Sequence, residues 1–129
     1  MGAGARMAAE RDRWPAHWRV ADLEVEQDCL LEQLQDAEEL RAVVPGMRRS
    51  TSDGDVQVLV GVTDRRVVVV GRRRDGLTVR VIDVTDCATA AARTTVVPYW
   101  DGTWAFDLDA DSAARVWATI DSVVPASIG

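Results

Sequence analysis

The stretch VQVLVGVTDRRVVVVGRRR, residues 56–74, decides the fold of this 129-residue chain. It reads as two β-strands joined by the turn Thr63-Asp64-Arg65-Arg66. In the first strand every second residue from Val56 to Val62 is valine, so valines occupy one face of the strand. The second strand contains the run Val67–Val70, and β-branched residues of this kind favour strands over helices. A β-hairpin is therefore predicted at the centre of the chain.

Further strands are expected on both sides of this hairpin. Upstream, Glu38–Val44 is predicted to form a strand ending at the turn dipeptide Pro45-Gly46, and a last helical turn is the alternative for these residues. Downstream, Asp75-Gly76 suits a tight turn, and Leu77–Val84 follows as the next strand. Two weaker strands are expected within Asp86–Val97, broken near Arg93 or Thr94, and a helix is the alternative for the alanine run there. A second Asp-Gly hairpin is expected at residues 99–104, and its strand ends near Leu108. This gives about seven antiparallel strands, which a meander would curl into a barrel or two packed sheets.

Helical patterns occur at the two ends of the chain. Residues 16–37 place leucines on one face and acids on the other, which predicts an acidic amphipathic helix. A C-terminal helix is predicted after Asp109 or Asp111, either of which suits its N-cap, and Pro125 is expected to stop it. Its apolar stripe is expected to comprise Ala113, Val116, Trp117, Ile120, Val123 and Val124. Residues 1–15 show no sustained period and are expected to form a flexible N-terminal arm.

The composition indicates an acidic globular protein. The formal net charge is −6, and all 15 basic residues are arginine. This charge repels nucleic acid at long range, so no nucleic-acid partner is expected. No apolar run is long enough to span a bilayer, and the N-terminus lacks the apolar segment of a signal peptide, so a cytoplasmic protein is expected. Cys29 and Cys87 have no CxxC spacing, which favours two reduced thiols over a disulfide.

No residue pattern in the chain indicates catalysis. His17 is the only histidine, and no recognisable nucleophile motif accompanies it. The alternating acids Asp107, Asp109 and Asp111 suggest calcium, but the glycine and glutamate of an EF-hand are not at the required spacing, and helix capping explains them better. We therefore expect no enzyme activity, no metal and no cofactor.

The central turn also carries a family resemblance. The strand-and-turn pattern around Thr63, Asp64 and Arg66, followed by Val67–Val70, resembles the bacterial pleckstrin-homology-like domains, particularly the YokE-like branch. Glu39-Leu40-Arg41 resembles a preceding strand of that family, and Trp104-Ala105-Phe106 its closing strand. The resemblance implies a seven-stranded antiparallel bent barrel capped by the C-terminal helix. It implies a domain over residues 38–125, with the helix at 16–37 added before it, and a non-enzymatic role.

Arginines are expected to gather at one end of the meander, because alternate turns lie at the same end. The end opposite Arg65 and Arg66 is predicted to hold Arg48, Arg49, Arg72, Arg73 and Arg74. Pleckstrin-homology domains that bind inositol phosphates carry basic residues there, so the resemblance makes these arginines candidates for an anion- or phosphate-binding end. A solvated hairpin tip is the simpler interpretation, since Asp53, Asp55 and Asp75 stand among them.

Two tryptophans near the N-terminus are candidates for an interaction surface. Trp14 and Trp18 are four residues apart and share one face of a helical turn. They would either anchor a partner or dock on the barrel, and docking within the chain is favoured because large apolar groups seldom stay exposed on monomers.

These observations favour an interaction module that binds an unknown protein partner or self-associates. The acidic pI and the open strand edges of an incompletely closed barrel support this interpretation. The alternative is an anionic ligand or phospholipid headgroup bound at the arginine end, with peripheral membrane contact, and an enzyme is the third and least favoured class.

Overall fold

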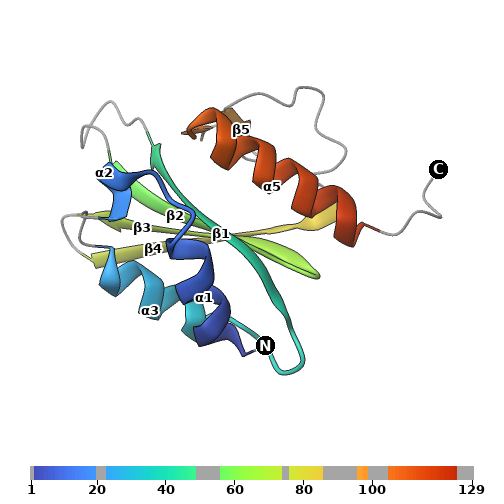
Figure 1. Cartoon of the computed structure of the whole chain (residues 1–129). Coiled ribbons are helices and arrows are strands. Elements are labelled where there is room, and N and C mark those ends of the chain that lie inside the picture. Colours follow the sequence, from blue (N-terminus) through green and yellow to red (C-terminus); the bar gives the residue numbers. More distant parts are fainter. Residues whose placement is uncertain are drawn as a thin grey trace.

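A computed structural model describes residues 2–19, 23–48, 56–73, 76–85, 96–98 and 105–124 (Figure 1). Three helices come first: α1 (Ala3–Arg11), α2 (Ala16–Arg19) and α3 (Glu24–Glu32). The strands are β1 (Leu40–Arg48), β2 (Val56–Thr63), β3 (Arg66–Arg73), β4 (Gly76–Asp83), β5 (Val96–Pro98) and β6 (Ala105–Asp107). Helix α5 (Ala110–Val123) closes the described chain.

The predicted central hairpin is confirmed as β2 and β3. Their antiparallel register pairs Val62 with Val67 and Val58 with Gly71. The Thr63 hydroxyl accepts the N–H groups of Arg65 and Arg66 at 3.0 and 2.8 Å, which fixes the turn between the strands. The described strands form one open antiparallel sheet in the order β4-β3-β2-β1-β6-β5.

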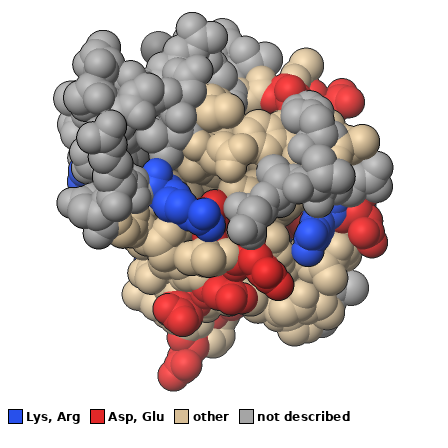
Figure 2. All heavy atoms as spheres, turned by 90° about the vertical axis from the view of Figure 1, so that its left-hand side faces the viewer, with Lys and Arg blue, Asp and Glu red and all other residues tan. Residues whose placement is uncertain are grey.

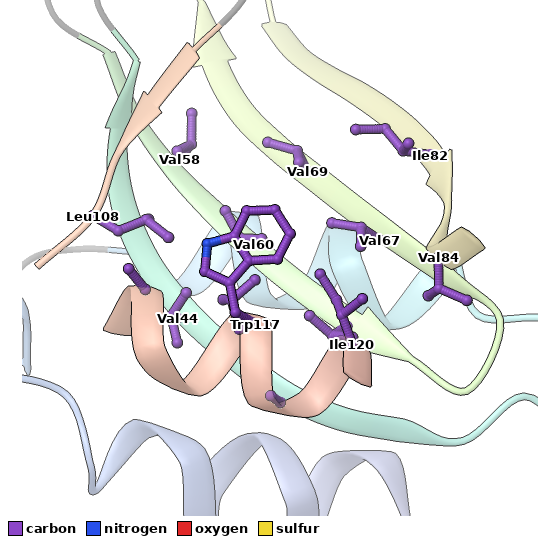
Figure 3. Close-up of a cluster of buried hydrophobic side chains, with 14 residues drawn as sticks. Val44, Val58, Val60, Val67, Val69, Ile82, Val84, Leu108, Trp117 and Ile120 are labelled. Atoms are coloured by element: carbon purple, nitrogen blue, oxygen red, sulfur yellow. The ribbon is translucent and has the colours of Figure 1, made fainter. Parts of the chain in front are cut away.

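Helices cover both faces of this sheet, as Figure 1 shows. On one face, Trp117 and Ile120 of α5 pack against alternate valines of the central strands (Figure 3). On the other face, the N-terminal helices pack against the intervening residues, including Leu59 and Val68. Because both faces are covered, all of Val67–Val70 is at most 1% exposed, and an uninterrupted apolar run suits this strand.

Close packing of α3 on the sheet depends on a glycine. A Cβ added at Gly61 of β2 would lie 2.9 Å from the methyl groups of Leu30 in α3, which is itself fully buried. Gly61 therefore lets the helix approach the sheet at a position where a larger residue would collide.

The N-terminal third differs from the sequence-based expectation. Residues 1–15 were expected to form a flexible arm, but α1 occupies most of this segment and buries Met7 and Glu10. The single helix expected over residues 16–37 is instead two helices, α2 and α3. A folded N-terminus is possible because its helices have a sheet face on which to pack.

Strand β1 also differs from its prediction, because it continues through Pro45-Gly46 to Arg48. Val43 directs its N–H and C=O away from β2, toward the N-terminal segment. Residues two positions apart in a strand share this direction, so the missing N–H of Pro45 faces away from β2 as well. Proline therefore interrupts no bond between β1 and β2, and it does not end the strand.

The C-terminal predictions are mixed in outcome. The fold is mainly β with flanking helices, as expected, and α5 buries the predicted residues Ala113, Val116, Trp117 and Ile120. Asp109 is the N-cap residue, but its side chain makes no capping bond. The described part of the chain has six strands rather than seven. The expected strand and turn at residues 86–95 and 99–104 lie outside the described residues, as does Pro125.

Candidate functional site

The arginine end is only partly within the described residues. The backbones of Arg48 in β1 and of Arg72 and Arg73 in β3 lie at the same end of the sheet, since Arg48 pairs with Val56 and Gly71 with Val58. The side chains of Arg48 and Arg73 are outside the description, and so are Arg49 and Arg74 entirely. The predicted gathering is thus seen for three backbone positions.

Arg72 is engaged by a buried acid. Its Nη2 lies 2.6 Å from Oε1 of Glu26 in α3, and the Glu26 side chain is 1% exposed. This ion pair joins α3 to the end of β3. An anion that approached Arg72 would have to compete with Glu26, whose carboxylate would be left buried without its partner.

The distribution of charged atoms on the surface is consistent with the neutralisation of Arg72 by Glu26. On the face shown in Figure 2, basic atoms occur in separate patches, with acidic atoms beside and below them. The exposed acids of α3, Glu24, Asp28 and Glu32, contribute to the acidic character of the N-terminal layer. The described residues on this face form no continuous basic basin.

Both candidate tryptophans lie inside the protein. Trp14 and Trp18 are 4% and 8% exposed. The indole N–H of Trp14 donates to the Val43 carbonyl at 2.9 Å, and that of Trp18 donates to Asp109 Oδ2 at 3.1 Å. They dock within the chain, which was the favoured alternative, and the Asp109 side chain binds Trp18 rather than the first N–H groups of α5.

The N-terminal segment covers the outer edge of β1. β1 pairs with β6 only at Met47 and Arg48, so the first half of the strand has no neighbouring strand on that side among the described residues. There the Val43 N–H donates to Glu10 Oε1 at 3.1 Å, while its carbonyl accepts from Trp14. Two side chains thus satisfy backbone groups that a further strand would otherwise bind.

Glu10 is a buried carboxylate with several partners. Arg115 of α5 donates to its two oxygens at 2.7 and 2.6 Å, and the more exposed Arg13 lies 3.6 Å away. The hydrogen bonds that Arg115 donates to Glu10 raise the pKa of the Arg115 guanidinium. Glu10 therefore connects α1, the β1 edge and α5, and we call Glu10, Trp14, Val43 and Arg115 the β1 cover.

A cleft of about 600 Å³ lies beside the β1 cover. Its lining includes Arg13, Trp14, Ser112 and Arg115. Both of these arginines are directed at Glu10, and Asp111 also lines the cleft, so two acids balance the two arginines and leave little net charge for an anionic ligand. Among the described residues, no group of three or more His, Cys, Asp or Glu side chains could hold a metal ion.

The turn that carries the family resemblance is bound to the chain before β1. The Thr63 hydroxyl donates to Glu38 Oε2 at 2.7 Å, and Arg66 donates to both Glu38 oxygens at 2.8 and 2.6 Å. Asp64 also contacts this preceding segment, because its Oδ1 accepts the N–H of Glu39 at 3.0 Å. Each motif residue thus has a structural contact.

Glu38 is held ionised by this network. Burial alone would raise the pKa of its carboxyl, but hydrogen bonds from Arg66, the Gln35 N–H and Thr63 lower it to about 2 from an ordinary 4.5. The same pairing raises the pKa of Arg66. The perturbed carboxyl is explained by a structural ion pair, which is the common alternative to a catalytic acid.

The opposite edge of the sheet, β4, has a different character. It is the terminal strand and pairs only with β3 among the described residues. Leu77 is 39% exposed, and Val79 and Val81 are half-buried at the border of the core. Leu77 and Val25 are the two exposed large hydrophobic residues in the described part of the chain.

Leu77 and Val25 belong to the same corner of the protein. Glu26, next to Val25, binds Arg72, and Arg72 is the β3 partner of Leu77. An edge strand with partly exposed apolar residues is a common place for another strand to bind. This edge is the strongest candidate site in the described structure.

Comparison with known proteins adds no assignment. No family model, curated protein or solved structure matches the chain. None of the described helices has the length and apolarity needed to cross a bilayer.

Sequence reasoning missed the buried acids Glu10, Glu26 and Glu38. Glu10 was expected in a flexible arm and Glu26 on the acidic face of a helix, yet each of the three acids binds an arginine far away in the chain. No local pattern reports such pairs. For Glu38, the sequence offered one indication: this residue directly precedes Glu39-Leu40-Arg41, which resembles a strand of the family.

Proposed function

We propose that this chain is a non-enzymatic, cytoplasmic interaction module that binds a protein strand along the outer edge of β4. One observation carries the proposal: β4 is an eight-residue terminal strand with no neighbour on its outer side among the described residues. Its apolar residues lie half-exposed along that edge. Strand addition would satisfy the outward backbone groups and cover these side chains at once.

Membership of the pleckstrin-homology-like, YokE-like group is part of this proposal. Support comes from the contacts of Thr63, Asp64 and Arg66, which bind three residues of the resembling turn to the segment that leads into β1. A C-terminal helix packed on one face of an antiparallel sheet is also compatible with that fold. A structural motif of this kind carries no activity by itself.

The alternative function, an anion or phospholipid headgroup at the arginine end, has weaker support. Arg48, Arg72 and Arg73 share one end of the sheet. However, Arg72 already binds the buried Glu26, so the ligand would have to exchange with an internal carboxylate. Co-sedimentation with anionic vesicles at low salt is the direct test of this alternative.

Amide hydrogen exchange of the full chain tests the proposed edge. In dilute, monomeric protein, we expect the outward amides of Leu77, Val79 and Val81 to exchange much faster than the amides of Thr78, Arg80 and Ile82, which are bonded to β3. The matched comparison comes from alternate residues of one strand, so global stability affects both sets equally.

The exchange pattern decides whether the edge is available. If the outward amides are as strongly protected as the inward ones in the monomer, the β4 edge is closed and the proposed function is wrong. If they are unprotected, the next question is which strand binds there.

A further inference from the structure

We propose that the strand that binds β4 is β4 of a second copy of this chain, antiparallel and in a register centred on Val79. This inference rests on the proposed function and names the partner at the same edge. The direction of the backbone groups, the apolar pattern and the side chains of β4 support this partner and register.

The direction of the backbone groups follows from one hydrogen bond. The Val84 N–H donates to the Arg65 carbonyl at 3.1 Å, so the even-numbered residues at this end face β3. The register is unbroken from Asp83 to Gly76, and hydrogen-bonded pairs alternate along an antiparallel ladder. Leu77, Val79 and Val81 therefore direct their N–H and C=O groups outward.

The same three residues form an apolar row. Val79 and Val81 pack at the border of the cluster on the α3 face, whereas Ile82 belongs to the cluster under α5. Alternation along the strand places Leu77 on the α3 face as well. Outward backbone groups and apolar side chains thus belong to the same residues.

Backbone bonding limits the registers of a symmetric pair. An outward residue of one copy must oppose an outward residue of the other, so odd-numbered residues pair only with odd-numbered ones. The two-fold axis must then pass through a residue rather than between two neighbours. Near the middle of β4 the axis can pass through Thr78, Val79 or Arg80.

The side chains distinguish these registers. An axis at Arg80 would pair Val79 with Val81 but set the apolar Leu77 opposite the acidic Asp83, which interrupts the apolar row. An axis at Thr78 would pair Leu77 with Val79 and place Val81 beyond the first residue, Gly76, of the partner strand. An axis at Val79 pairs Val79 with itself and Leu77 with Val81 twice.

The Val79 register therefore makes one continuous apolar row across the two copies. It also places Arg80 opposite the uncharged Thr78. A two-fold pair of this kind is closed, so it ends at two copies rather than growing into a filament. One strand per copy is a small contact, so we expect a reversible dimer whose population depends on concentration.

Single cysteines test the register directly. In the full chain carrying Cys29→Ser and Cys87→Ser, one cysteine is placed in turn at Thr78, Val79 or Arg80, and mild oxidation follows at concentrations where sedimentation detects the dimer. Opposed residues of a hydrogen-bonded pair have Cα atoms about 5.5 Å apart, within reach of a disulfide. We expect Val79→Cys to cross-link at least about tenfold faster than Thr78→Cys and Arg80→Cys, because only position 79 meets itself.

Each result has a defined meaning. Fastest cross-linking through Thr78→Cys or Arg80→Cys would overturn the register. A chain that sediments as a monomer up to millimolar concentration would overturn the second copy as partner. Neither result concerns the exchange of the outward amides, so the proposed function would stand or fall separately on that measurement.

Discussion

The two edges of the sheet are treated in opposite ways. At the β1 edge, the N-terminal segment binds both backbone groups of Val43, through Glu10 and Trp14. At the β4 edge, the described chain offers no such cover, and Leu77 remains 39% exposed. An uncovered strand edge invites association, and proteins usually protect such edges. One edge is therefore closed as part of the fold, and the other is the edge that binds a strand under the proposed function.

The cost of closing an edge differs from the cost of leaving one open. The β1 cover buries the carboxylate of Glu10, which is tolerable only because Arg115 and the Val43 N–H accompany it. Under the proposed function, the outward backbone groups of β4 are instead satisfied by the strand that binds there. Substitutions at the two edges should therefore affect stability and association very differently.

The largest expected effect comes from breaking the β1 cover. Glu10→Ala removes the acceptor of the Val43 N–H and leaves the guanidinium of Arg115 without its carboxylate. We expect the free energy of unfolding to fall by about 3–5 kcal/mol, as for one partner removed from a buried pair. Urea denaturation of both proteins at neutral pH measures the difference.

The matched control for this prediction is Arg13→Ala. Arg13 also approaches Glu10, but at 3.6 Å and with a side chain that is 62% exposed. Its loss should cost at most about 1 kcal/mol, as for other surface ion pairs. Equal losses in the two variants would show that Glu10 is not the centre of the cover.

The next effect concerns the segment that leads into β1. Glu38→Gln weakens the bonds from Arg66 and Thr63, and we expect a loss on the order of 2–3 kcal/mol at pH 7, as for hydrogen bonds to charged groups. Denaturation at pH 7 of this variant and the parent measures it, and exposed Glu39→Gln is the control.

The pH dependence of Glu38 has a definite sign. Its pKa is about 2 in the folded chain and ordinarily 4.5, so the unfolded chain binds its proton first as the pH falls. The stabilisation is complete above about pH 5 and is lost progressively as the pH falls toward 2. Glu38→Gln should flatten this part of the profile. A slope unchanged by the substitution would contradict the assigned ion pair.

The sequence was sufficient where a local pattern decides the structure. The β2–β3 hairpin follows from valine alternation and a threonine-containing turn, and the stripe of α5 follows from helical spacing. The sequence was insufficient where contacts between residues far apart in the chain determine the structure. Helix α1 offers little apolar spacing, and its buried side chains include Glu10, whose partner Arg115 is 105 residues away. A charged residue in a short helix is expected to be exposed to solvent, unless it is known to pair with a residue such as Arg115.

The candidate site was predictable to the same degree. An open strand edge was expected from the meander, but its location at β4 required the order of the sheet. The arginine end was placed correctly for the backbones of Arg48, Arg72 and Arg73. The ion pair between Arg72 and Glu26 could not be predicted, because it depends on how α3 crosses the end of β3.

A smaller effect is expected from the second contact of the β1 cover. Trp14→Phe keeps an aromatic ring but removes the donor to the Val43 carbonyl, which should cost about 1–2 kcal/mol. Trp18→Phe should cost less, because its acceptor Asp109 is exposed and can bind water instead. Urea denaturation gives both values, and a larger loss for Trp18→Phe would contradict the importance assigned to the edge.

The smallest effect on stability, and the sharpest contrast, is expected at Thr78 in β4. Its neighbour across the ladder is Gly71, so a longer side chain there should change the free energy of unfolding by no more than about 0.5 kcal/mol. In the proposed dimer, however, Thr78 opposes Arg80 of the second copy, and the pair occurs twice. Thr78→Lys should therefore weaken the dimer and Thr78→Glu strengthen it, each by about 0.2–1 kcal/mol per pair.

Sedimentation at several concentrations measures the dimer dissociation constant of each variant relative to the parent chain. Urea denaturation measures whether the monomers of the variants are as stable as the parent monomer. Opposite shifts from two side chains of similar length isolate charge from bulk, since bulk would act in the same direction in both variants. Equal shifts would mean that Arg80 does not face position 78, and the register centred on Val79 would then be wrong. We expect the two substitutions to leave the stability of the monomer unchanged and to differ only in their effect on the dimer. This result would indicate that the fold itself does not use the β4 edge, which leaves the edge free for a partner.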